Sequence, residues 1–182
     1  GSLPRTVEVL DAMKARRSGD DVDEAAYYQM IRDGVRNIVK RQIDLGIDIV
    51  ADGEMSKVGF FSYIEERMEG FEPRQDEKHK LFAAEMAAFP EYYEEYFGRM
   101  MLGGAVVPMY PMCCVGPVRY KGEEVLARDL DNLKSALEGL NCEGAFVPAV
   151  APAGVGYNTF YATEEEFAVA VAEALRIGYL AI

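Results

Sequence analysis

Two carboxylates, Asp52 and Glu54, follow directly on an apolar stretch of the chain. That stretch, residues 47–51, reads Ile-Asp-Ile-Val-Ala and predicts a buried strand. Ligands of α/β proteins with parallel strands bind at the carboxyl ends of those strands, so the two carboxylates are candidates for a binding site. The sequence leaves an alternative open, in which Asp52 caps the next helix and Glu54 lies in its first turn, where carboxylates offset exposed N–H groups.

Helices must hold this strand in place. Apolar residues recur every three or four positions from Ala25 to Val39 and predict a long helix that opens at residues 20–23 and ends at Gly46. We expect further helices at residues 6–17, 60–68 (stopped by Gly70), 123–137 and 163–182, the last opened by a capping box of Thr163 and Glu166. Residues 145–150 predict a second buried strand.

Residues 72–104 differ from the rest because they are charged and aromatic. Two helical patterns, 76–89 and 91–100, flank Pro90, and no strand is expected before residue 105. We interpret residues 72–104 as a helical insertion that serves as a lid or an oligomer contact. Short strands at 106–110 and 112–115 follow, with a turn at Gly116 and Pro117.

Composition narrows the class of protein. The chain has 182 residues, with 31 acidic against 19 basic ones and a net charge of -12, so its surface repels phosphate backbones and no nucleic acid is expected. The longest apolar run, 103–118, is too short and too rich in proline to cross a membrane, and the first twenty residues do not form a signal peptide. Three cysteines make no disulfide framework, and we expect reduced thiols in a cytoplasmic protein.

The alternation of strands and helices predicts an α/β fold with a parallel sheet, and composition does not choose between an open sheet and a closed barrel. No G-x-G-x-x-G motif follows a strand, which argues against a dinucleotide fold.

Five segments in order carry a resemblance to a known family. They are GSLPR at residues 1–5, GIDIVADGE at 46–54, FFSYIEERMEGFE at 60–72, VGPVRYKGEEVLARDLDNLK at 115–134, and FVPAVAP with NTFYATEEEF at 146–167. Together they resemble the catalytic barrel of cobalamin-independent methionine synthase, and above all its shorter single-barrel relatives.

The resemblance implies a TIM (β/α)8 barrel, of which residues 1–182 cover about the first half, with the insertion 72–104 inside it. It also implies a methyltransferase that moves a methyl or alkyl group to a zinc-activated thiol such as homocysteine, from a 5-methyltetrahydropteroyltriglutamate-like (folate) donor. The family's zinc ligands, a His-x-Cys pair, a glutamate and a second Cys, are expected outside this chain, which alone should be inactive. The single histidine, His79, lies between lysines and reads as a surface residue, and Cys113 and Cys114 point to opposite faces of a strand.

Carried over by resemblance, Gly1, Ser2 and Glu54 bind the amino-acid end of the thiol substrate. Asp52 stands where the synthase has a histidine, so a thiol other than homocysteine stays open. Arg5 and Lys57 are nearby cations that could bind an acidic tail. No residue is assigned as a catalytic acid or base.

Two other functions remain in competition. One is a metal-free barrel relative of lyase or decarboxylase type, because a barrel fixes no chemistry. The other is a non-catalytic half-barrel whose open sheet edges are covered by a partner or by a second copy in a homo-oligomer.

Overall fold

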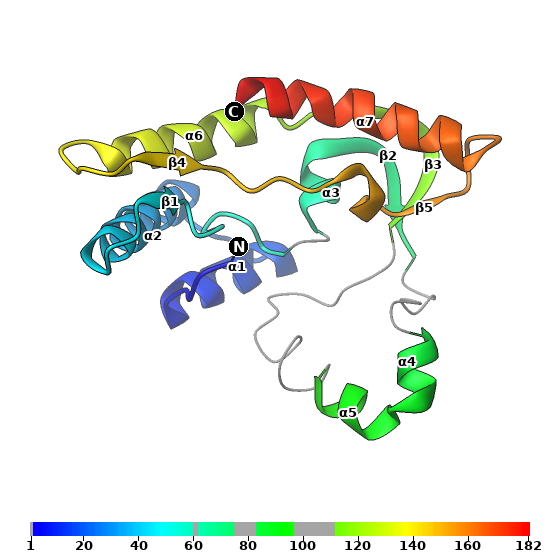
Figure 1. Cartoon of the computed structure of the whole chain (residues 1–182), viewed down its shortest axis with the longest axis horizontal. Helices are drawn as coiled ribbons and strands as arrows, with labels where there is room; N and C mark the ends of the chain where they lie inside the picture. Colours follow the sequence, from blue (N-terminus) through cyan, green and yellow to red (C-terminus); the bar gives the residue numbers. More distant parts are fainter. Residues whose placement is uncertain (1, 60–61, 75–82, 97–111) are drawn as a thin grey trace.

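The computed structural model describes residues 2–59, 62–74, 83–96 and 112–182 (Figure 1). The helices are α1 (Val7–Ser18), α2 (Glu24–Asp44), α3 (Ser62–Arg67), α4 (Ala83–Ala88), α5 (Pro90–Glu95), α6 (Glu123–Leu137) and α7 (Glu164–Ala181). The strands are β1 (Ile49–Ala51), β2 (Met68–Pro73), β3 (Met112–Tyr120), β4 (Gly144–Phe146) and β5 (Tyr157–Asn158), and a 3-10 turn covers Pro152–Gly154. The fold is mixed α/β.

The long helix α2 confirms the periodic pattern. The Asp23 side chain accepts a hydrogen bond from the Ala26 N–H at 3.1 Å and caps its first turn. One face of the helix buries Tyr27, Ile31, Val35, Val39 and Gln42. The chain leaves the helix through Gly46, whose φ of +80° lies in the left-handed region that glycine adopts without strain.

The strands β1 and β4, which come directly after α2 and α6 in the chain, form a parallel pair. β1 pairs with β4, with Ile49 opposite Gly144 and Ala51 opposite Phe146. In the chain α6 directly precedes β4 and packs beside α2, and the parallel pairing of β1 with β4 agrees with the parallel strands predicted, although β2 and β3 lie between them in sequence. Met13, Val39, Val50 and Leu133 belong to the apolar core beneath it.

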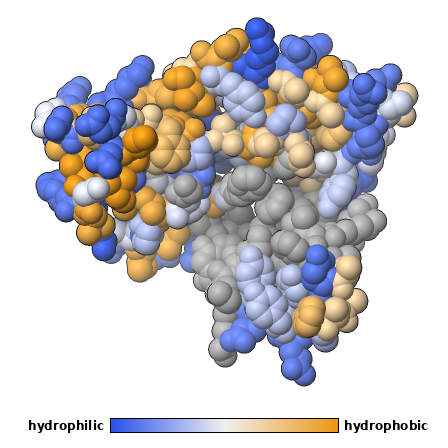
Figure 2. Space-filling view, viewed as in Figure 1, coloured by the Kyte–Doolittle hydropathy of each residue, from blue (hydrophilic) through white to orange (hydrophobic). Residues whose placement is uncertain are grey.

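The prediction that both of these strands are buried is only partly right. Val50 and Ala51 are buried, but Ile49 and Phe146 are 57% and 48% exposed, and Ile47 before the strand is 44% exposed. Figure 2 shows hydrophobic surface on the side where α2, β1 and β4 lie. One side of the β1–β4 pair therefore carries apolar side chains that no described residue covers.

A second sheet has the order β2-β3-β5. β3 pairs in parallel with β5 and antiparallel with β2. The sequence did not predict β2: the expected helix ends at Arg67, and residues up to Pro73 are extended, so the expectation of no strand from residue 72 onward is wrong at Glu72 and Pro73. Gly70, read as a helix stop, lies inside the strand with φ +88°.

The expected turn at Gly116 and Pro117 is also wrong, because β3 continues to Tyr120. Glu69 faces Arg119 whereas Phe71 faces Cys114, so extra residues of β3 bulge outward opposite Gly70. A Cβ on Gly70 would lie 2.6 Å from the Pro117 carbonyl oxygen. The bulge thus needs glycine on the facing strand.

Helix α7 covers the second sheet. Its first turn is capped as predicted, since the Thr163 hydroxyl accepts from the Glu166 N–H at 3.1 Å. Phe167, Val171 and Leu175 pack with Ile64 and Cys114 in a second core, whereas Tyr179 near the end of the helix is 41% exposed.

The predicted insertion lies between β2 and β3. Its described helices α4 and α5 pack on each other at one end of the molecule (Figure 1), and the boundaries 72–104 stay a prediction. Gly1, His79 and the expected strand 106–110 lie outside the described residues. No helix in the described part of the chain is long and apolar enough to cross a membrane.

Candidate functional site

The turn that follows β1 is locked from two directions. The Gln42 side chain of α2 accepts from the Ala51 N–H at 3.1 Å and donates to the Ala51 carbonyl at 2.8 Å, so it fixes the end of the strand. From the N-terminal segment, the Leu3 N–H donates to the Gly53 carbonyl at 3.0 Å. The carboxylates that follow the strand therefore stand on a defined backbone.

Asp52 shapes this turn. Its side chain is buried and accepts from the Glu54 N–H at 3.0 Å. Burial raises the pKa of Asp52, and the Lys57 ammonium, 3.9 Å away, offsets part of that effect. Residues 53–56 form a turn, and the next described helix is α3, so the helix-cap alternative for Asp52 is wrong.

Glu54 has a backbone conformation that is unusual for its type, with φ at +55°. Arg5 holds this part of the chain, because its Nη2 donates to the carbonyls of Glu54 at 2.5 Å and Lys57 at 2.6 Å. Its Nε also points to the Met55 carbonyl at 3.4 Å. Burial lowers the pKa of Arg5 and the nearby Glu54 opposes that shift. The geometry makes Arg5 a clamp on the backbone, and contact with an acidic tail stays a prediction.

Three of the predicted site residues line one small cavity of about 60 Å³: Ser2, Glu54 and Lys57. The Ser2 hydroxyl donates to the Glu54 carboxylate across 52 positions of sequence. Gly59, Tyr63 and residues 148–150 after β4 complete the walls. The cavity therefore lies where the loops after β1 and β4 meet the N-terminal segment.

Lys57 contributes a buried ammonium to this cavity. Its Nζ donates to the Pro148 carbonyl at 2.6 Å, which ties the loop after β1 to the loop after β4. The site thus offers one carboxylate and one ammonium within a small, half-enclosed space whose walls are otherwise mostly apolar. Such a pair is complementary to a zwitterion, whose ammonium would face Glu54 and whose carboxylate would face Lys57 and the Ser2 hydroxyl.

A metal centre does not fit the described residues. They contain no group of three or more His, Cys, Asp or Glu side chains that could hold a metal ion. Cys113 and Cys114 are both buried in β3, and burial raises the pKa of the Cys114 thiol, which disfavours the thiolate that zinc requires.

The sequence did not reveal a buried ion pair behind this site. Arg67, at the end of α3, donates to the Asp129 carboxylate of α6, and both side chains are almost completely buried. Burial alone would lower the pKa of Arg67, but Asp129 outweighs it and the pKa is raised. The Tyr63 ring lies 4.6 Å from the guanidinium. A charged pair at residues 67 and 129 has no local sequence signal.

The geometry therefore defines an α/β chain with a small pocket at the ends of two parallel strands, where a carboxylate and an ammonium lie close together. Residues 1–88 match the family described as cobalamin-independent synthase, catalytic domain.

Named relatives agree with the match. The chain is 35% identical over 71 residues to a 5-methyltetrahydropteroyltriglutamate–homocysteine methyltransferase of Rhodococcus jostii, which is 39% of this chain and 9% of the relative. It is 29% identical over 112 residues to the protein of that name from Mycolicibacterium paratuberculosis, 62% of this chain and 13% of the relative. The Vibrio cholerae protein of that name is 33% identical over 75 residues, which is 41% of this chain and 10% of the relative. The matches thus span about a tenth of each relative's length.

Proposed function

We propose that this chain supplies the substrate-anchoring part of a methyltransferase of the cobalamin-independent methionine synthase type. In this proposal the parallel strands β1 and β4 belong to a TIM (β/α)8 barrel, and the substrates are a thiol amino acid such as homocysteine and a methylated pteroylglutamate donor. The observation that carries the proposal is the meeting of Ser2 and Glu54 in one pocket with Lys57.

The pocket's size decides which part of the substrate it takes. With a volume of about 60 Å³, the cavity has room for only a small part of a ligand. It is far below the roughly 300–1,000 Å³ of sites that enclose whole ligands. We therefore assign to it the amino-acid head alone, with the thiol directed outward.

Each charged group has a partner in that assignment. Glu54 receives the substrate ammonium in place of the Ser2 hydroxyl, and the freed hydroxyl then donates to the substrate carboxylate. Lys57 adds a positive charge on the carboxylate side. Zinc remains part of the proposal, with its ligands outside the residues that the structure describes.

The same geometry bears on the two competing functions. A decarboxylase that acts on an acidic substrate needs several cations at the strand ends. Arg5 donates its Nη2 and Nε to backbone carbonyls, and Lys57 already donates to the Pro148 carbonyl, so the described contacts do not favour that class. Assembly with a second copy is favoured by one observation, the exposed apolar residues Leu45, Ile47, Ile49 and Phe146 around the β1–β4 pair. Light scattering over a range of protein concentrations tests it: a mass that stays monomeric excludes assembly.

Binding of L-homocysteine to the chain tests the main proposal. Titration calorimetry compares the wild type, Glu54→Gln, and Glu165→Gln as a control that removes the same charge from exposed α7. Loss of a charge-assisted hydrogen bond of about 1.5–3 kcal/mol weakens binding roughly 10- to 100-fold in Glu54→Gln only. 4-Mercaptobutanoate, which lacks the amino group, should not distinguish Glu54→Gln from wild type. Equal homocysteine affinity in Glu54→Gln and wild type would contradict the proposal.

A further inference from the structure

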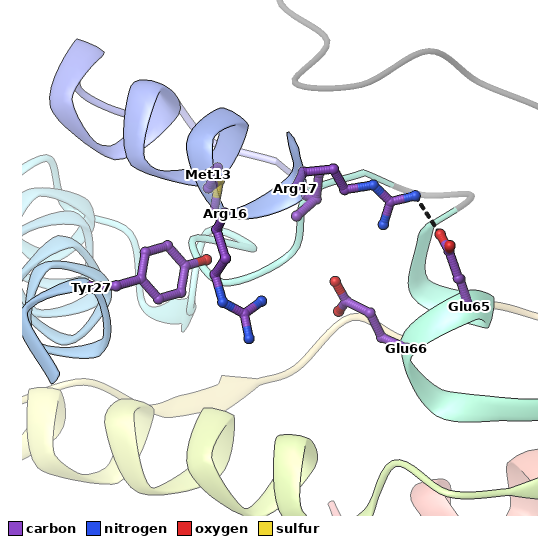
Figure 3. A pocket seen from close by; sticks show the side chains of 7 residues that line it. Met13, Arg16, Arg17, Tyr27, Glu65 and Glu66 are labelled. Atoms are coloured by element: carbon purple, nitrogen blue, oxygen red, sulfur yellow. Dashed lines mark hydrogen bonds and ion pairs between the residues drawn. The ribbon is translucent and has the colours of Figure 1, made fainter. Parts of the chain in front are cut away.

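A larger cavity lies apart from the Ser2–Glu54 pocket. It has a volume of about 460 Å³, within the range of small-molecule sites. Helices α1, α2 and α3 supply its walls, through Met13, Arg16, Arg17, Tyr27, Glu65 and Glu66, with Val58 beside them (Figure 3). A neighbouring space of about 190 Å³ shares Arg16, Tyr27 and Glu66 and extends to α6.

Most charges that line this cavity are already paired. Arg16 donates through Nε to the Glu24 carboxylate at 2.8 Å and through Nη2 to the Tyr28 hydroxyl at 3.2 Å. Arg17 forms an ion pair with Glu65. These contacts leave the arginines with partners of their own inside the molecule, so an anionic ligand would have to compete for them.

Glu66 is different. Among the described residues its carboxylate has no hydrogen bond and no ion pair, and Figure 3 shows it directed into the cavity from α3. The side chain is half-buried, and burial raises the pKa of Glu66 although Arg67, Arg17 and Arg16 oppose that shift. A carboxylate that has lost part of its hydration without gaining a partner is a site where a cation is stabilised.

The surrounding surface suits a flat, positively charged group. The Tyr27 hydroxyl has no hydrogen-bond partner among the described residues, and because burial raises the pKa of Tyr27 to about 12, it stays a neutral hydroxyl that can accept a hydrogen bond. Guanidinium groups already lie against the tyrosine rings here: Arg16 is 5.2 Å from the Tyr27 centroid, and Arg128 is 3.9 Å from that of Tyr28. The net charge of -12 attracts cations to the molecule as a whole.

We propose that the cavity between α1, α2 and α3 binds a small organic cation with N–H donors, of guanidinium or alkylammonium type, through the Glu66 carboxylate and the Tyr27 hydroxyl. The site is separate from the Ser2–Glu54 pocket and does not depend on the proposed function. Its ligand is recognised by one positive charge and by directional hydrogen bonds, so charge without N–H groups is not enough.

Methylguanidinium serves as the probe, in a nuclear magnetic resonance titration of the full chain at low ionic strength. Saturable shifts should appear at residues of α1, α2 and α3. Glu66→Gln keeps the shape of the side chain and should weaken binding about tenfold or more, because a charge-assisted hydrogen bond is lost. Glu173→Gln, which removes the same charge from an exposed position on α7, should leave the affinity within about twofold.

Two further measurements separate this site from general attraction to an acidic surface. Tetramethylammonium carries the charge without N–H donors and should bind at least about tenfold more weakly than methylguanidinium. Tyr27→Phe removes the second hydrogen-bonding group and should weaken binding severalfold with the ring retained. Equal affinity of Glu66→Gln and wild type, an absence of saturable binding to wild type, or preferential binding of inorganic phosphate at these residues would overturn the proposal.

Discussion

Replacing Arg5 by methionine should destabilise the protein much more than loss of a surface arginine does. The Nη2 group donates to the carbonyls of Glu54 and Lys57 at 2.5 and 2.6 Å. Hydrogen bonds from a charged donor contribute about 1.5–3 kcal/mol each. Because Arg5 is only half-buried, the low end applies, and two bonds give a loss of about 3 kcal/mol in the free energy of unfolding.

The loss should extend to the binding pocket. Without the clamp, the carbonyls of Glu54 and Lys57 lose their charged donor from the N-terminal segment, and the positive φ of Glu54 can relax. The Glu54 carboxylate would then occupy several alternative positions. We expect homocysteine affinity to fall together with stability, although in the proposed complex Arg5 does not touch the ligand.

Urea denaturation followed by circular dichroism measures the first effect. Arg36→Met is the matched control, since Arg36 is exposed on α2 and its loss should cost less than about 0.5 kcal/mol. Arg5→Lys retains the charge, but its nitrogen lies one bond nearer the backbone than Nη2 and it lacks the Nε donor, so it should resemble Arg5→Met. A midpoint for Arg5→Met that equals that of Arg36→Met would refute the reasoning.

Three other perturbations have expected outcomes. Asp129→Asn leaves the buried guanidinium of Arg67 without its counter-charge and should lower the free energy of unfolding by about 3–5 kcal/mol, or abolish folding, as measured by urea denaturation. Gly70→Ala forces a methyl group to 2.6 Å from the Pro117 carbonyl at a positive φ and should lower the melting temperature; an unchanged value would mean that the bulge can shift. Burial raises the pKa of Glu66 above 4.5 in the folded state. The native protein therefore keeps the Glu66 proton to a higher pH than the unfolded chain does, and the free energy of unfolding should fall as pH rises from 4.5 through the folded-state pKa. Glu66→Gln should remove this part of the decline and be more stable than wild type at pH 7, and a steeper decline in the variant would contradict the sign.

Much of the local structure was readable from the sequence. The periodic apolar face of α2 and the cap at Thr163 depend on residues within a few positions of each other, and both are confirmed. The predictions made from glycine residues were wrong where the glycine is required by a contact between strands that are distant in sequence. Gly70 and Gly116 look like breaks in isolation, but one accommodates the bulge that contains the other.

In the candidate site, too, local features were predicted from the sequence and tertiary contacts were not. The carboxylates after β1 were found because a polar cluster ends an apolar strand. The clamp by Arg5 was not, because its partners are backbone carbonyls about fifty positions away, and a carbonyl has no residue type to recognise. The Glu66 cavity arises where three helices converge, which no local pattern records.

The position of a bound amino acid relative to Glu54 tests the central claim most directly. A crystal structure of the chain with L-homocysteine should place the amino nitrogen within hydrogen-bond distance of the Glu54 carboxylate, with the carboxylate of the ligand near the Ser2 hydroxyl and the sulfur outside the pocket. An amino acid bound elsewhere, or bound here with its ammonium away from Glu54, would contradict the assignment of this pocket as the substrate anchor.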